Sequence, residues 1–381
     1  MAITDKKTGP WGLDQVYNKI NQGSIWSYSG AGQLWVWGSN NYGNFGVNNR
    51  TQYSSPVQVP GNWTNSKVFR KCGEADIFHS AVIKSDGTLW SWGNNTYGRL
   101  GHNNQTHYSS PVQVGSDTTW SSGDLLRMAT GAIKTDNTLW SWGYGNWGML
   151  GQNESNQPYS SPIQIPGTNW SQTAGGHLNC FGIKTDGTLY AWGNNHHGKL
   201  GLNQNQNDSG FSRSSPAQVP GTTWSIVSAL PSGGGAVKTD GTLWMWGSNG
   251  SGMLGQGNLT QYSSPVQVPG TTWGKTTLTF PNGNNAMANI KTDGTLWMWG
   301  DNSEGQLGQN DRTSCSSPKQ VPGTTWRSIT TIGDSMVYIA TKTDGTLWAW
   351  GKNDDGLVAQ STQPDNGGED AYSSPTQIPG T

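Results

Sequence analysis

The sequence contains little charge and no long apolar segment. Asp, Glu, Lys and Arg make up 12% of the 381 residues, and the formal net charge at pH 7 is −1. A chain so poor in basic residues lacks a polybasic face for nucleic acid or an anionic membrane. No run approaches the roughly 18 apolar residues of a membrane span, and the first residues lack the apolar core of a signal peptide. We therefore expect no nucleic-acid partner, no membrane insertion and synthesis in the cytoplasm.

Motifs for metal binding and catalysis are also scarce. The sequence has three cysteines, Cys72, Cys180 and Cys315. Their odd number and the absence of Cys-x-x-Cys indicate neither a disulfide framework nor a zinc site. His196 and His197 are adjacent but have no third ligand at metal spacing. There is no Gly-x-Ser-x-Gly, P-loop or dinucleotide fingerprint. We predict no cofactor, no metal site and no catalytic residue, and leave open whether an acidic loop near Asp301 or Asp354 holds calcium.

Glycine and tryptophan, in contrast, are abundant, with 55 and 22 residues. Most tryptophans belong to one recurring segment, of which residues 84–101 (Lys-Ser-Asp-Gly-Thr-Leu-Trp-Ser-Trp-Gly-Asn-Asn-Thr-Tyr-Gly-Arg-Leu-Gly) are a typical copy. The last aromatic of its Leu-(Trp/Tyr)-x-Trp-Gly motif recurs every 50–55 residues, at Trp37, Trp92, Trp142, Trp192, Trp246, Trp299 and Trp350. A period near 50 indicates a repeat protein. Residues 30–381 are therefore predicted to form one seven-repeat unit.

Each repeat contains signals for four short strands. Asp-Gly between two apolar runs predicts a hairpin, with these two residues at the positive-φ positions of a type I′ turn. The strand after this turn, such as residues 88–92, alternates large and small side chains, both faces of which need burial. The strand before it, such as residues 80–84, begins with small residues and is expected nearest the central axis. A Tyr-Ser-Ser-Pro strand follows, and a fourth strand begins near the next Trp, as at residues 324–329. The sequence thus predicts an all-β fold, a seven-bladed β-propeller of four-stranded blades.

The motif Asp-Gly-Thr-Leu-Trp-x-Trp-Gly-x-Asn-x-x-Gly-x-Leu-Gly resembles the repeat of the regulator-of-chromosome-condensation family, over about residues 30–381. The resemblance implies a seven-bladed propeller, as the strand pattern does, but says little about function. The family's nucleotide exchange factor has a basic tail, its β-lactamase inhibitor is exported, and its photoreceptor surrounds tryptophans with Arg and acidic residues. None of these features is found in this sequence.

The chain ends do not follow the repeat. The last repeat stops after residues 372–380, where earlier copies continue to a Trp, and residues 9–11 and 24–29 resemble the missing step. We therefore expect the two ends to pair in one composite blade that closes the ring. Within residues 1–29, apolar residues at helical spacing predict a short amphipathic helix. The residues expected to act in ring closure or docking are Trp11, Leu13, Val16, Tyr17, Ile20 and Trp26.

Residues 11–26 resemble a short Trp-x-Leu…Tyr…Gly-x-Trp segment of structural proteins of marine tailed bacteriophages. This resemblance implies a virion component, either capsid-decorating or associated with a tail or fibre, which binds other virion proteins or a host-surface component. Two alternatives stay open: a cytoplasmic protein-interaction propeller of a bacterium, and a carbohydrate-binding or glycan-active propeller. The segment itself could instead only cap the first blade.

Differences between the copies indicate where a partner would bind. Insertions in repeat proteins map to one rim, often the binding rim, and the loops here lengthen at residues 202–212 and 357–371. Aromatic and basic side chains occupy variable positions of the preceding Asn-Asn loop in the second to fourth repeats, where they are either contact anchors or incidental variation. They are Tyr97, Arg99, Trp147, His196, His197 and Lys199. We predict a non-enzymatic binding module.

Overall fold

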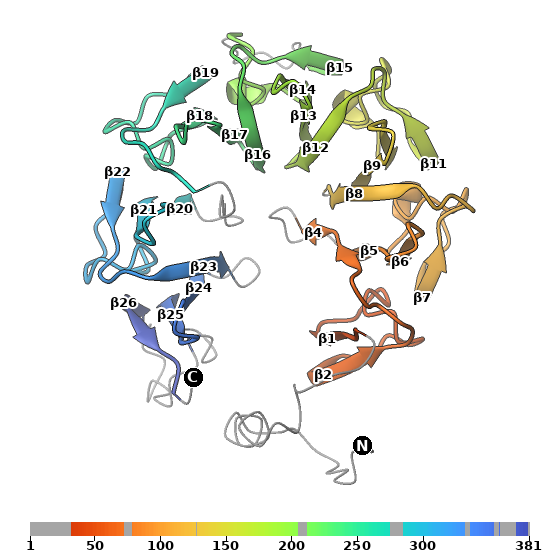
Figure 1. Ribbon diagram of the computed structural model, residues 1–381, viewed down its shortest axis with the longest axis horizontal. Helices are drawn as coiled ribbons and strands as arrows, with labels where there is room; N and C mark the ends of the chain where they lie inside the picture. Colours follow the sequence, from red (N-terminus) through yellow and green to blue (C-terminus); the bar gives the residue numbers. More distant parts are fainter. Residues whose placement is uncertain are drawn as a thin grey trace.

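The computed structural model describes residues 32–71, 78–126, 128–204, 212–274, 285–331, 336–353, 358 and 371–379. Within these residues seven β-sheets follow one another around a ring (Figure 1). The helical content of the described residues consists of three single-turn 3-10 segments, η1 (Thr96–Gly98), η2 (Asn146–Gly148) and η3 (His196–Gly198). No helix among the described residues is long and apolar enough to cross a membrane. The prediction of an all-β, seven-bladed propeller agrees with this arrangement.

A complete blade has four strands, ordered outward from the centre of the ring (Figure 1). The innermost strands are β3 (Lys67–Val68), β8 (Trp120–Leu125), β12 (Trp170–Gly175), β16 (Trp224–Leu230) and β23 (Trp326–Thr331). The second strands are β5 (His79–Ile83), β9 (Ala129–Lys134), β13 (Asn179–Lys184), β17 (Gly233–Lys238), β20 (Ala286–Ile290) and β24 (Val337–Lys342). A short strand, β4 (Arg70–Lys71), adds to the third sheet by pairing in parallel with β8.

The two outer positions are occupied in all seven sheets. The third strands are β1 (Leu34–Gly38), β6 (Leu89–Gly93), β10 (Leu139–Gly143), β14 (Leu189–Gly193), β18 (Leu243–Gly247), β21 (Leu296–Gly300) and β25 (Leu347–Lys352). The outermost strands are β2 (Tyr53–Val59), β7 (Tyr108–Gln113), β11 (Tyr159–Gln164), β15 (Arg213–Gln218), β19 (Tyr262–Gln267), β22 (Cys315–Gln320) and β26 (Ala371–Gln377). We number the blades one to seven in the order of β1, β6, β10, β14, β18, β21 and β25.

The structure corrects the predicted order of strands within a blade. Residues 80–84, predicted to lie nearest the axis, form the second strand, and the strand that begins at Trp326 is the innermost strand of the next blade. The physical reason is the turn after each outermost strand, which is Pro-Gly in most blades. The turn carries the chain from the periphery of one blade to the centre of its neighbour, so a sequence repeat is offset from a structural blade.

The hairpin turn also differs from the predicted type I′ turn. Gly87 alone supplies the left-handed conformation, with φ of 79°, and its N–H donates to the Lys84 carbonyl at 2.9 Å, as in a three-residue loop with a bulge. Asp86 acts through its side chain, because Oδ1 accepts hydrogen bonds from the N–H and Oγ1 of Thr88 at 2.9 and 2.6 Å. We call the edge of the ring that carries these turns the hairpin rim.

Neighbouring blades are joined by a repeated hydrogen bond, which we call the indole–carbonyl contact. The indole N–H of the second Trp in the motif donates to a backbone carbonyl in the loop of the preceding blade. These pairs are Trp92–Asn44, Trp192–Met149, Trp246–Lys199, Trp299–Met253 and Trp350–Gln306, at 2.8–3.1 Å. Trp142 is equally buried, but its N–H has no partner among the described residues, and the corresponding carbonyl of Arg99 accepts a hydrogen bond from Thr130 Oγ1.

The seam of the ring differs from the other junctions. Trp37 is 60% exposed, and among the described residues its sheet contains only β1 and β2. The last sheet, in contrast, draws all four of its strands from residues 326–377, so the described residues contain no strand shared between the two ends. The predicted composite blade is therefore not confirmed. The predicted helix and its residues lie outside the described part of the chain, namely Trp11, Leu13, Val16, Tyr17, Ile20 and Trp26.

Candidate protein-binding rim

The loops between the third and outermost strands form the rim opposite the hairpin rim, and we call this edge the loop rim. A buried Asn fixes the loop of most blades from inside. In blade five, Asn249 Oδ1 accepts from the Leu254 N–H at 2.9 Å, while Nδ2 donates to the carbonyls of Asn258 and Thr260 at 3.0 and 2.9 Å. Because the loop closes around its own amide, its outward residues are free to vary. In blade three Gly145 replaces this Asn.

Two residues after this position, three successive blades hold a bulky ring in an uncommon backbone conformation. Tyr97, Trp147 and His197 have φ of 66°, 61° and 61°. Left-handed backbone is unfavourable for large side chains, and such residues gather at functional sites. In blades five and six the same position holds Ser251 and Glu304. The aromatic residues are thus concentrated on one side of the rim.

We group the rings on this side of the rim as the aromatic arc, made of Tyr97, Tyr144, Trp147, His196 and His197. The Tyr97 and Trp147 side chains are each 38% exposed. The Tyr97 and Tyr144 ring centroids lie 4.6 Å apart, and those of the two histidines 3.9 Å apart. Burial raises the pKa of Tyr144, and burial followed by the charge of His196 lowers the pKa of His197. Both shifts favour the uncharged forms of Tyr144 and His197.

Arg99 and Lys199, also predicted to be surface contacts, are 4% and 6% exposed. Lys199 Nζ donates to the carbonyl of His177 at 2.7 Å, and Arg99 Nε donates to that of Thr96 at 3.0 Å. Both side chains thus bind backbone inside the ring and are not presented to a partner. The sequence contained a signal for this burial, because the equivalent position in other repeats holds apolar residues such as Met149.

Sequence reasoning missed Tyr144, which contacts Tyr97 across the blade junction. The available signal was that Tyr144 and Gly145 replace the Asn-Asn of other repeats. Among the residues that the structure describes, no cluster of three or more His, Cys, Asp or Glu side chains could hold a metal ion. Burial also raises the pKa of the Cys180 thiol, which favours its unreactive form.

Comparison with protein families gives a match over more than half of the chain. The model described as the regulator of chromosome condensation (RCC1) repeat matches residues 31–74, 86–130, 186–229, 240–275 and 293–333. The X-linked retinitis pigmentosa GTPase regulator homolog of Caenorhabditis elegans is 39% identical over 88 residues, which are 23% of this chain and 6% of that protein. The human E3 ubiquitin-protein ligase HERC2 is 25% identical over 130 residues, 34% of this chain and 3% of the ligase. The chain thus matches less than a tenth of the length of either relative.

Solved structures match most of the chain at lower identity. Human WBSCR16 superposes with a TM-score of 0.69 and 20% identity, over 91% of this chain and 93% of that one. Prp20p of Saccharomyces cerevisiae, described with its binding to Gsp1p and histones, has a TM-score of 0.71 and 16% identity, over 91% of this chain and 85% of its own. At such identities the likeness shows the fold alone.

Proposed function

Because the chain belongs to the regulator of chromosome condensation (RCC1) repeat family, we propose that it is a non-enzymatic protein-binding propeller whose contact surface is the aromatic arc. The observation that carries this proposal is the row of left-handed Tyr97, Trp147 and His197 on adjacent blades. Large rigid rings provide contact area at little entropic cost and are enriched at the energetic centres of interfaces. Maintaining unfavourable backbone to expose them is consistent with a binding role.

The relatives support this class of function without naming a partner. Prp20p was described together with its binding to Gsp1p and histones, and a further structure shows yeast RCC1 (Prp20) with Kap60 bound. In both cases a protein that shares this fold binds other proteins. The low charge of the present chain argues against a histone-like partner, whose recognition would rest on acidic patches.

We further propose that the protein is a virion component of a tailed bacteriophage, and that its partner is another virion protein or a component of the host surface. Residues 1–29 would attach the propeller to the particle. The support is the resemblance of residues 11–26 to phage structural proteins and the low-charge surface. Mass spectrometry of purified particles tests this idea directly. Stoichiometric copies of the chain are expected, whereas their absence, with the chain found in the bacterial cytoplasm, would favour the interaction propeller of a bacterium.

The aromatic arc is tested separately, by photo-crosslinking. A benzoyl-phenylalanine placed at Tyr97 or Trp147 is expected to give a discrete crosslinked protein in particles or host extract. The matched control is Leu259, which is 63% exposed on the loop rim of blade five and lies outside the arc. Equal crosslinking from Leu259 and from the arc, or none from the arc, would refute the assignment of the contact surface. Tyr97→Ala and Trp147→Ala should each weaken the captured partner's affinity by tenfold or more, about 1.4 kcal/mol or above.

A further inference from the structure

Six lysines on the hairpin rim are each held between two aromatic rings. Each Nζ lies 3.9–5.1 Å from the centroids of two rings. One ring is the Trp that follows the outermost strand of the preceding blade, and the other belongs to the third strand. The lysines are Lys84, Lys134, Lys184, Lys238, Lys291 and Lys342. An ammonium over aromatic faces is attracted by about 0.5–2 kcal/mol, but its charge is not neutralised. The repeat therefore places a half-buried positive charge in each of six successive blades.

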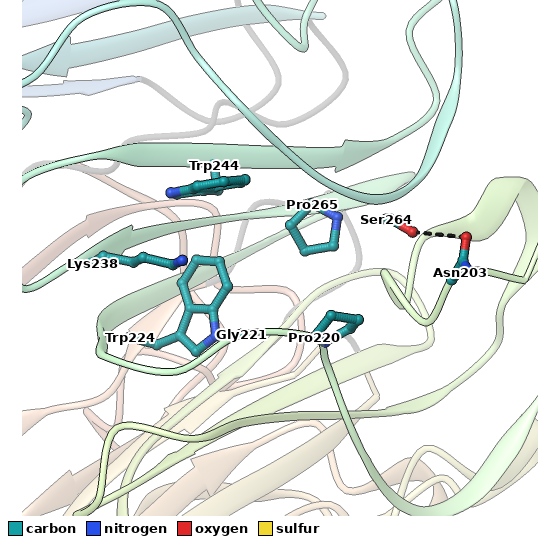
Figure 2. A pocket seen from close by; sticks show the side chains of 8 residues that line it. All are labelled: Asn203, Pro220, Gly221, Trp224, Lys238, Trp244, Ser264 and Pro265. Atoms are coloured by element: carbon teal, nitrogen blue, oxygen red, sulfur yellow. Dashed lines mark hydrogen bonds between the residues drawn. The ribbon is translucent and has the colours of Figure 1, made fainter.

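Lys238 lines a groove of about 400 Å³ at the junction of blades four and five (Figure 2). We call it the lysine–tryptophan groove, lined by Asn203, Pro220, Gly221, Trp224, Lys238, Trp244, Ser264 and Pro265. Figure 2 shows the two indoles and the two proline rings facing the same space, with Lys238 at one end and the hydrogen-bonded pair of Asn203 and Ser264 at the other. Flat apolar walls with a few polar groups are typical of small-ligand sites.

Glycine keeps the charged end of this groove open. A Cβ at Gly221 would lie 3.5 Å from both Lys238 Nζ and Trp224 Nε1. The Trp224 indole N–H is buried and has no hydrogen-bond acceptor among the described residues. Two donors thus converge beside a residue without a side chain.

Blade three contains a natural experiment on this position. Asp117 lies three residues before Trp120, which begins the innermost strand of blade three, and Gly221 lies three residues before the equivalent Trp224 of blade five. Asp117 Oδ2 lies 2.5 Å from Lys134 Nζ, while Lys134 stays 4.0 Å from the Trp140 ring. Among the described residues, Lys134 is the one of the six lysines with a carboxylate at ion-pair distance. A carboxylate therefore fits against this lysine without displacing it from the rings, and the chain provides its own in blade three.

We propose that the lysine–tryptophan groove binds an acidic sugar unit, whose carboxylate pairs with Lys238 and whose ring packs on the indole and proline walls. The hydroxyl groups of a pyranose match the amide and hydroxyl of Asn203 and Ser264 at the far end. The groove holds a ligand of the size of a sugar ring and leaves no room for a folded peptide element. Related lysine–aromatic arrangements on other blades suit a repeating polysaccharide, because linked weak sites gain affinity through effective concentration.

This inference is independent of the protein-binding proposal, since no residue that lines the groove belongs to the aromatic arc. The test is a titration of the full chain with methyl glucuronide, followed by the ¹⁵N–¹H signals of the indole groups, in buffer with physiological salt. The Trp224 signal, assigned with Trp224→Phe, is expected to shift saturably, and the Trp120 signal of the Asp117-blocked blade to stay unchanged. Lys238→Gln should raise the apparent Kd at least tenfold. Asp117→Gly should make the Trp120 signal respond.

Control ligands separate the possible occupants. Methyl glucoside, which lacks the carboxylate, is expected to shift the Trp224 signal at least tenfold less at equal concentration. If acetate shifts the Trp224 signal as strongly as the glucuronide does, the assignment to a sugar is overturned. If a Glu-containing peptide shifts the signal and the glucuronide does not, the groove is a peptide site instead. Absence of a saturable Trp224 shift in a chain with unchanged circular dichroism and melting temperature would overturn the groove as a binding site.

Discussion

The indole–carbonyl contact can be isolated by a pair of matched substitutions. Trp299 and Trp142 occupy the same position in two blades, and both side chains are fully buried. The Trp299 N–H donates to the Met253 carbonyl at 2.8 Å, whereas the Trp142 N–H has no partner among the described residues. Replacing either Trp by Phe removes a similar part of the ring and leaves a similar cavity. The difference between the two variants therefore reports the hydrogen bond.

The shared cost of lost burial and cavity formation is about 2 kcal/mol in each variant, less than the 3–5 kcal/mol of a full truncation to Ala. Trp299→Phe also leaves the Met253 carbonyl buried and unpaired, which costs about 1–3 kcal/mol more. Trp142→Phe instead removes a donor that was already unpaired. We therefore expect Trp299→Phe to destabilise the protein by about 2 kcal/mol more than Trp142→Phe.

Urea titrations followed by far-ultraviolet circular dichroism measure this difference, because the fluorescence signal itself changes when a Trp is removed. The comparison requires equal m-values, which show that both variants unfold the same amount of surface. Equal losses of stability, or a larger loss for Trp142→Phe, would refute the reasoning that the contact joins the blades energetically.

Three further predictions concern single residues. Burial, followed by the charge of Arg99, lowers the pKa of His79 well below its usual value. The unfolded chain binds a proton at this histidine below pH about 6.5, whereas the folded chain does not. The free energy of unfolding should therefore fall by up to about 2 kcal/mol between pH 7 and pH 5, and by less in His79→Gln. The same dependence on pH in the wild type and in His79→Gln would contradict this. Trp147→Asn should raise the free energy of unfolding by about 0.5–1 kcal/mol, since Asn tolerates φ near 60°, while weakening partner binding; a lower melting temperature would show that the ring supports the fold. Asn249→Ala should cost about 3 kcal/mol in urea titrations, because it removes three hydrogen bonds inside the loop, and a cost below 1 kcal/mol would contradict that role.

The repeat could be predicted from the sequence because its strongest signals are local and periodic. The Leu-(Trp/Tyr)-x-Trp-Gly strand and the Asp-Gly turn lie within a few residues of each other, and seven copies exclude chance. The position of each strand relative to the axis could not be predicted, because it depends on which blade the chain enters after the Pro-Gly turn. A propensity or turn signal gives no information on that choice.

In the candidate sites, too, the local features could be predicted from the sequence and the contacts between distant residues could not. The exposed rings of Tyr97 and Trp147 follow from their variable loop positions, but the burial of Arg99 and Lys199 depends on how the strands pack. Lys199 Nζ, for example, contacts the carbonyls of His177, 22 residues away in the same blade, and of Pro231 in blade five. The lysine–aromatic contacts could have been inferred, since every Lys precedes its hairpin turn and one ring follows it in sequence. The second ring comes from the innermost strand, whose position was predicted wrongly.

The acceptor in the indole–carbonyl contact is main chain, and this has a consequence for the history of the molecule. The residue that provides the carbonyl is Asn44, Met149, Lys199, Met253 or Gln306 in different blades, with the same bond to the next Trp. A newly duplicated unit would therefore carry both halves of the connection and fit beside any other unit. Loop mutations can accumulate afterwards without loss of the indole–carbonyl contact. Gene duplication followed by divergence therefore yields new recognition surfaces on an unchanged fold.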